Sequence, residues 1–309
     1  MPSPSRQLWS VAALALWLVA ATHAAAQPAA TNADAATQRL CNACHFDKFE
    51  AIGRTPHIAL FSAEAQQSTG HTIGCTNCHG DVAAHIAAGG GRGTVFAFRT
   101  EAVIARNDVC LGCHRAAHPT FDRSPHARAG LACTSCHSQH GGGATALLRT
   151  PDVPPDIARL GARSRLCFDC HNGPFAEAAL NEHHRLVEGV LECTSCHDPH
   201  APATRSLLGG FKQQQCAGCH ADKSGPFVFE HRASRTEGCT ACHSPHGSPN
   251  RHLLAYQRVG ELCLSCHAAV PQFHAGFNAA APPRFGLDTQ CTSCHSAIHG
   301  SNFHPYFLR

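Results

Sequence analysis

The sequence predicts an extended chain of mostly coil with short α-helices, built from repeats rather than around one side-chain core. Three observations predict this fold class. All 20 Cys fall in ten copies of one motif, Cys-x-x-Cys-His. Charged residues make up only 15% and aromatic residues 6% of the 309 residues, which is poor material for a conventional core of this length. The 26 Gly and 19 Pro divide the chain into short segments.

The cysteine motif indicates what fills the interior instead of side chains. Two thiols three residues apart can add to the two vinyl groups of one haem, and the adjacent His can bind the iron of that haem, so this spacing is typical of c-type haem attachment. Disulfide scaffolds use Cys at varied spacings, and zinc ribbons do not place a His identically after each Cys pair. The sequence therefore predicts a multihaem cytochrome c with ten c-type haems.

The motifs assign the covalent and proximal positions directly. The predicted haem-attachment residues are Cys41, Cys44, Cys75, Cys78, Cys110, Cys113, Cys133, Cys136, Cys167, Cys170, Cys193, Cys196, Cys216, Cys219, Cys239, Cys242, Cys263, Cys266, Cys291 and Cys294. The predicted proximal ligands of the haem irons are His45, His79, His114, His137, His171, His197, His220, His243, His267 and His295.

The second axial ligand is predicted from the supply of side chains. The single Met is Met1, which is lost with the predicted signal peptide, so Met ligation is excluded and two-His or five-coordinate iron remains. Subtracting His23 and the ten motif His from 26 leaves 15 His. We expect bis-His ligation, with distal candidates that follow a motif closely or lie between motifs: His57, His85, His126, His140, either His183 or His184, His200, His231, His246, His274 and His299. Which distal His serves which haem is left open by the sequence.

The motifs alternate in type along the chain, which predicts a repeat. Counted from the N-terminus, the odd motifs have no His three residues after the motif, whereas most even motifs do. An odd and an even motif together span roughly fifty residues, and this unit recurs five times. The predicted dihaem units are approximately 41–100, 101–150, 151–210, 211–256 and 257–309, within a decahaem domain of residues 27–309. Short helices are expected to lead into motifs at Thr100–Val109 and Gln257–Leu262, and Leu pairs at 147–148, 207–208 and 253–254 are expected to pack on porphyrin faces.

Residues 1–26 read as a secretory signal peptide. Arg6 is followed by a short apolar run and by small residues at Ala24–Ala26, which is the pattern of a cleaved signal. Export would place the protein beyond the cytoplasm, and no later apolar stretch approaches the roughly 20 residues that span a bilayer. The formal charge of +3 omits two propionates on each haem, so the basic balance predicts no nucleic-acid partner.

Ten haems in so short a chain must lie close together, which favours electron hopping between them. An iron with two His ligands has no vacant position for a substrate, so we expect an electron carrier and no enzyme. Three classes stay open at this point: a conduit across a membrane, a soluble shuttle or capacitor, and a multihaem reductase with an open iron.

The chain resembles the MtrA/DmsE-type periplasmic decahaem cytochromes. The resemblance rests on ten Cys-x-x-Cys-His motifs, the signal peptide, a length near 300 and the repeated Cys-Thr-Ser-Cys-His-x-x-His, and it covers essentially the mature chain. It implies two fused five-haem halves. The second motif, at Cys75, departs from the pattern because no His follows it closely.

The resemblance also implies a location and partners. The location is the periplasm, with insertion into an outer-membrane β-barrel porin of the MtrB type. The implied donors or acceptors are periplasmic or inner-membrane cytochromes on one side of the membrane. On the other side they are an extracellular multihaem cytochrome or a mineral such as an iron oxide. The direction of electron flow is not predicted. A loop-rich electron relay cannot lie against lipid, so a separate barrel would have to enclose it within a hydrocarbon layer of about 30 Å.

Overall fold

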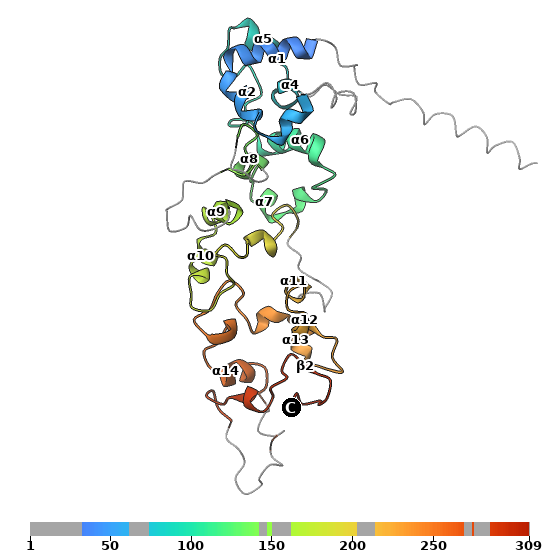
Figure 1. The fold of residues 1–309 in the computed structure, drawn as a ribbon, viewed down its shortest axis with the longest axis vertical. Helices are drawn as coiled ribbons and strands as arrows, with labels where there is room; N and C mark the ends of the chain where they lie inside the picture. Colours follow the sequence, from blue (N-terminus) through green and yellow to red (C-terminus); the bar gives the residue numbers. More distant parts are fainter. Residues whose placement is uncertain are drawn as a thin grey trace, which may run out of the picture.

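The described part of the chain is an elongated array that advances in sequence order from one end to the other (Figure 1). A computed structural model describes residues 33–61, 74–141, 147–149, 162–202, 214–268, 274 and 285–308. Helix α1 lies at one end, and the chain reaches strand β2 near the other. The predicted signal peptide at 1–26 and the Leu pair at 207–208 lie outside the described residues.

The odd motifs lie at or just beyond the C-terminal ends of helices. These helices are α1 (Ala33–Cys44), α6 (Val103–His114), α9 (Ala162–Phe168), α11 (Gln214–Ala217) and α14 (Val259–Leu264). The helices expected at Thr100–Val109 and Gln257–Leu262 are therefore present, but each begins later than expected and continues into its motif. The motif extends the helix because neither Cys nor His is a strong helix breaker.

The even motifs instead begin short helices or 3-10 turns. These are α4 (Cys75–His79), α8 (Cys133–Cys136), η4 (Cys193–Ser195), η5 (Cys239–Ala241) and η7 (Cys291–Ser293). The third motif residue caps several of these turns: Ser135 Oγ accepts from the Ala132 N–H at 3.2 Å, and Ser195 Oγ accepts from the Glu192 N–H at 3.1 Å. A side chain that reaches back to the residue before the turn satisfies one N–H that the turn leaves free. This explains the recurrent Cys-Thr-Ser-Cys.

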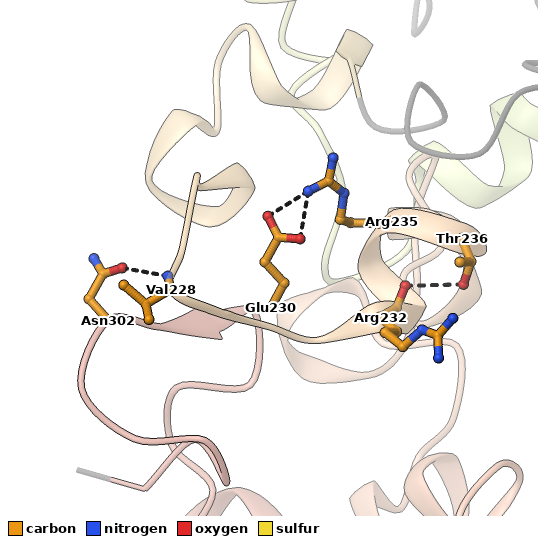
Figure 2. Close-up of polar contacts among 6 residues, drawn as sticks. All are labelled: Val228, Glu230, Arg232, Arg235, Thr236 and Asn302. Carbon is orange, nitrogen blue, oxygen red and sulfur yellow. Dashed lines mark hydrogen bonds and ion pairs between the residues drawn. The ribbon is translucent and has the colours of Figure 1, made fainter.

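The segments between motifs contain further short elements. The helices and 3-10 turns are α2 (Phe46–Ile52), η1 (Pro56–Phe61), α5 (Ala83–Ala87), η2 (Phe121–Arg123), α7 (Pro125–Arg128), α10 (Asn172–Ala178), α12 (Ala221–Ser224), α13 (Arg232–Thr236) and η6 (Arg251–Leu253). Two-residue strands β1 (Phe229–Glu230) and β2 (Gly300–Ser301) pair antiparallel. Beside them the Val228 N–H donates to Asn302 Oδ1 at 3.0 Å, and Arg235 pairs with the Glu230 carboxylate (Figure 2).

In two units the odd helix is joined to the even motif by the residue three positions before the first Cys of the odd motif. Asn107, which is 7% exposed, accepts from the Cys133 N–H at 2.8 Å through Oδ1. The corresponding Ser164 is fully buried, and its Oγ accepts from the Cys193 N–H at 3.3 Å. Residues three apart on a helix share a face, so this residue lies beside the first Cys of the motif. The two motifs of one unit are thereby held together.

At two of the recurrent Leu pairs, the first Leu forms a backbone hydrogen bond with the residue that directly follows the even motif. The Ser138 N–H donates to the Leu147 carbonyl at 2.7 Å, and the Ser244 N–H donates to the Leu253 carbonyl at the same distance. Leu147 and Leu253 have φ of 55° and 56°, a left-handed conformation that is uncommon outside Gly. The same backbone arrangement in two units supports the repeat. Packing of these side chains on porphyrin stays a prediction.

Apolar side chains do not form a continuous core in the described residues. The buried apolar residues are few and scattered: Val82, Leu111, Phe121, Ala132, Phe168 and Ala178. Several large apolar side chains are exposed instead, including Phe46 and Ile104. The predicted fold class, a mostly coil multihaem cytochrome c with short α-helices in an extended array, is confirmed. Among the described residues, no helix is both long and apolar enough to cross a membrane.

Candidate haem-binding sites

Each Cys-x-x-Cys-His motif folds into one helical turn that gathers its three side chains. In eight motifs the His N–H donates to the carbonyl of the first Cys at 2.8–3.0 Å, and the motifs at Cys75 and Cys110 lie within α4 and α6. Positions three and four apart on a helix share a face, so both thiols and the imidazole are presented together. All 20 thiols are free of disulfides. The motif is therefore arranged to hold one haem by two thioethers and one iron bond.

Beside each motif His lies one other His from elsewhere in the chain. In these histidine pairs the ring centroids are 5.9–6.2 Å apart. With the motif His given first, the pairs are His45–His85, His79–His140, His114–His57, His137–His200, His171–His126, His197–His246, His220–His184, His243–His299, His267–His231 and His295–His274.

This separation is the one that two imidazoles need on opposite sides of a metal. A bond of about 2 Å from each ring nitrogen to the metal places the two ring centroids roughly 6 Å apart. Two imidazoles in direct contact come closer, as His118 and His200 do with centroids 4.1 Å apart. The ten histidine pairs, the ten motifs and the sparse side-chain core all fit ten haems. A bound haem supplies an iron that takes up and releases one electron.

His183 and His184, the two alternatives left by the sequence, have different surroundings in the structure. His184 lies 6.1 Å from motif His220, with its Nδ1 2.7 Å from the Pro245 carbonyl oxygen. His183 instead contacts the Leu180 carbonyl through Nδ1 and the Glu188 carboxylate through Nε2 at 3.0 Å. The hydrogen bond to Glu188 raises the pKa of His183 and favours its protonated form, which cannot bind a metal. The ten other predicted distal candidates all lie in histidine pairs.

Backbone carbonyls hold many of the paired rings by their Nδ1 atoms. His79 contacts the Phe96 carbonyl at 3.1 Å and His126 the Pro199 carbonyl at 3.0 Å, and His243 and His295 make equivalent contacts at 2.8 and 2.6 Å. An Nδ1–H that donates to a carbonyl leaves Nε2 without a proton and aims it at the metal. These partners could not be predicted from the sequence because a backbone carbonyl has no residue signature. Two of the carbonyl partners belong to Pro199 and Pro245, which directly precede His200 and His246 in the sequence. A Pro before a predicted distal His is therefore the signal that could have indicated them.

Burial keeps several paired rings neutral. It lowers the pKa of His57, His140, His197, His200, His231 and His299, and the charge of the opposite ring lowers it further in each pair. A neutral imidazole is the form that offers a nitrogen lone pair to a metal. In these six rings, burial thus favours the neutral form that iron ligation requires.

The histidine pairs connect neighbouring predicted units in both directions. His57 of the first unit reaches forward to His114 of the second, while His140 of the second reaches back to His79 of the first. The same exchange recurs at the later boundaries: His126–His171 with His200–His137, His184–His220 with His246–His197, and His231–His267 with His299–His243.

Each of the two end units completes one histidine pair within itself. His85 pairs with His45 inside the first unit, and His274 pairs with His295 inside the fifth. In each later unit, the His that follows the even motif pairs with the even-motif His of the unit before it. The motif at Cys75 has no motif of an earlier unit beside it in the described residues, and its nearest His, His85, pairs with the first motif instead. This accounts for the departure noted in the sequence.

The thiols show how close successive motifs lie. Within a unit the first Cys of the odd motif hydrogen-bonds with the first Cys of the even motif, as Cys110 does with Cys133 and Cys167 with Cys193. Between units the second Cys residues approach: burial raises the pKa of Cys136, and the neighbouring Cys170 thiol raises it further. Successive attachment sites thus adjoin alternately through their first and second cysteines.

These features define a class of protein, the multihaem c-type cytochromes. Comparison with known families agrees. A doubled CXXCH motif family matches residues 183–225 and 231–272, and a family of NrfB-like c-type cytochrome proteins matches residues 75–150. The chain is also 32% identical over 279 residues to the multiheme cytochrome MtrA of Shewanella baltica, covering 86% of this chain and 78% of that protein.

The chain belongs to the MtrA family of multihaem cytochromes, and the predicted family is confirmed. As a member of this family it is an electron-transfer protein that binds haem. The doubled-motif matches each join an even motif to the following odd one, at Cys193 with Cys216 and at Cys239 with Cys263. These matches span the predicted unit boundaries, as the histidine pairs do. The positions of those boundaries stay a prediction.

Proposed function

We propose that the chain carries ten bis-His haems, each held by one motif and by one of the ten histidine pairs. The observation that carries this proposal is the recurrent separation of 5.9–6.2 Å between the paired rings. In each pair the motif His is the proximal ligand and the other His is the distal ligand. Two ligands from the protein saturate the iron, which suits a carrier of electrons and leaves no position for substrate.

The ten haems would form one continuous relay along the molecule. Successive motifs adjoin through Cys41 and Cys75 within the first unit, then through Cys78 and Cys113 across its boundary, and so on along the array. Because the array advances in sequence order along its long axis (Figure 1), the first and tenth haems lie toward opposite ends. Electrons that enter at one end can then leave at the other.

We infer that this relay crosses the outer membrane inside a β-barrel porin of the MtrB type. The relationship to MtrA supports this inference. The extended shape and the loop-rich backbone support it physically, because loops cross a hydrocarbon layer only when protein encloses them. The chain would reside in the periplasm, exchange electrons with periplasmic or inner-membrane cytochromes, and meet an extracellular multihaem cytochrome or iron acceptor beyond the barrel.

Reconstitution tests the conduit. A tagged chain is purified from membranes of the host together with any β-barrel that co-purifies. The two proteins are then placed in liposomes that enclose a reduced viologen dye, with a ferric chelate outside. We expect dye oxidation only when both proteins are present. Failure of a barrel to co-purify, or dye oxidation no faster than with the barrel alone, would instead assign the chain a soluble shuttle role.

A further inference from the structure

The loop that carries His246 is docked tightly on the end of α10. A Cβ atom at Gly247 would clash with the Glu177 carbonyl oxygen, so only Gly allows this approach. The next residue, Ser248, is 2% exposed and exchanges two backbone hydrogen bonds with Glu182 at 3.1 and 2.8 Å. The His252 N–H also donates to the Glu182 carboxylate at 3.0 Å. These contacts set the position of His246 relative to α10.

This docking places a carboxylate on a paired His. Glu177 Oε2 lies 3.1 Å from Nδ1 of His246. The contrast with the neighbouring pair is direct: His184, held by the same loop, donates to the neutral carbonyl of Pro245. Two adjacent haem sites thus differ in the charge of the group behind the distal ring.

We propose that Glu177 is a positioning residue that lowers the reduction potential of the haem held between His197 and His246. A carboxylate that accepts the Nδ1–H strengthens the imidazole as an electron donor and stabilises ferric over ferrous iron, more than a carbonyl does. This inference rests on the proposed ligation by His246. It creates a step in potential near the middle of the relay, between the haems at Cys193 and Cys216.

The test is a redox titration of the purified ten-haem protein with Glu177→Gln. Gln can still accept from Nδ1 but carries no charge. We expect the titration curve of Glu177→Gln to differ from that of wild type in one electron of ten. The reduction potential of the haem between His197 and His246 should rise, making its reduction at least tenfold more favourable, which is equivalent to about 59 mV. Glu188→Gln is the matched control, because Glu188 contacts His183, which lies in no histidine pair. The control is expected to titrate like wild type.

Low-temperature electron paramagnetic resonance (EPR) of the same samples separates tuning from loss of a ligand. We expect the haems of Glu177→Gln to stay low-spin, with a change in the g values of one of them. The same shift in both Gln variants, or a titration unchanged in Glu177→Gln, would overturn the proposal. A new high-spin signal would also overturn it, since Glu177 would then be needed to keep His246 on iron. These measurements involve no porin, so a negative result for Glu177 is distinct from a failure of the proposed conduit. Low-spin iron in all haems of His246→Ala would show instead that His246 is not a haem ligand.

Discussion

At two adjacent histidines, a single carbonyl distinguishes the ring that lies in a histidine pair from the one that does not. His183 and His184 are neighbours in sequence, and composition and spacing leave either as the distal ligand. The Pro245 carbonyl, 61 residues away, holds Nδ1 of His184 and turns its ring toward His220. By contrast, the haem-attachment Cys and the proximal His can be predicted from the sequence because the motif is local. A distal ligand is a long-range contact, so its pairing required the fold.

The first prediction separates these two residues. His184→Ala should convert one of ten low-spin haems to high-spin, because the iron held by His220 loses its distal ligand. His183→Ala should leave all haems low-spin, since His183 contacts only Leu180 and Glu188 among the partners described above. EPR of the two oxidised variants makes the comparison. A high-spin signal in His183→Ala and none in His184→Ala would reverse the assignment.

At the scale of elements, the alternation of odd and even motifs was visible in the sequence, but its structural cause was not. Odd motifs end helices and even motifs begin turns, and in two units a buried polar residue joins them. That residue is Asn107 in one unit and Ser164 in the next, so no constant residue type marks the position. The expected helix Thr100–Val109 differs from the observed α6 at its C-terminal end because the motif itself continues the helix as far as His114.

The second prediction concerns this junction. Asn107→Ala should destabilise the haem-loaded protein by about 1–3 kcal/mol, because the part-buried Cys133 N–H loses its acceptor. Asn302→Ala removes the same kind of bond at an exposed site, to the Val228 N–H (Figure 2), and should cost under about 0.5 kcal/mol. Guanidinium unfolding followed by circular dichroism in the haem absorption band measures both. Equal effects would show that Asn107 does not join the motifs.

At the scale of the whole molecule, the reciprocal histidine pairs make the array continuous. The sequence predicted five units and ten haems. It could not show that neighbouring units exchange histidines, because each exchange joins positions far apart in the chain. His57 with His114 and His140 with His79 tie the first two units in opposite directions. Both motif His of each inner unit therefore pair with a His from a neighbouring unit.

Truncation tests this exchange. A chain that ends at residue 256 lacks the last two motifs and should carry eight haems. It also lacks His299, the partner of His243, so one of the eight should be high-spin. His299→Ala in the full chain is the matched variant and should carry ten haems with one high-spin. Eight low-spin haems in the truncated protein would mean that units supply their own ligands.

The sparse core predicts dependence on haem. The few buried apolar residues, such as Leu111 and Phe168, cannot offset the entropy of ordering so long a chain. Expressed without haem attachment, the chain should show no cooperative thermal transition by far-ultraviolet circular dichroism, as in small domains that fold only with their metal. A cooperative transition in the haem-free chain would show that side chains alone sustain the fold.

Counting haems and their spin states in the intact protein tests the central claim most directly. Mass spectrometry of the denatured protein gives the number of covalent haems, and quantitative EPR of the oxidised native protein gives the ligation of each iron. The histidine pairs predict ten haems, all low-spin, with no high-spin component. Fewer than ten haems, or a high-spin iron in the wild-type protein, would contradict a relay of ten bis-His haems.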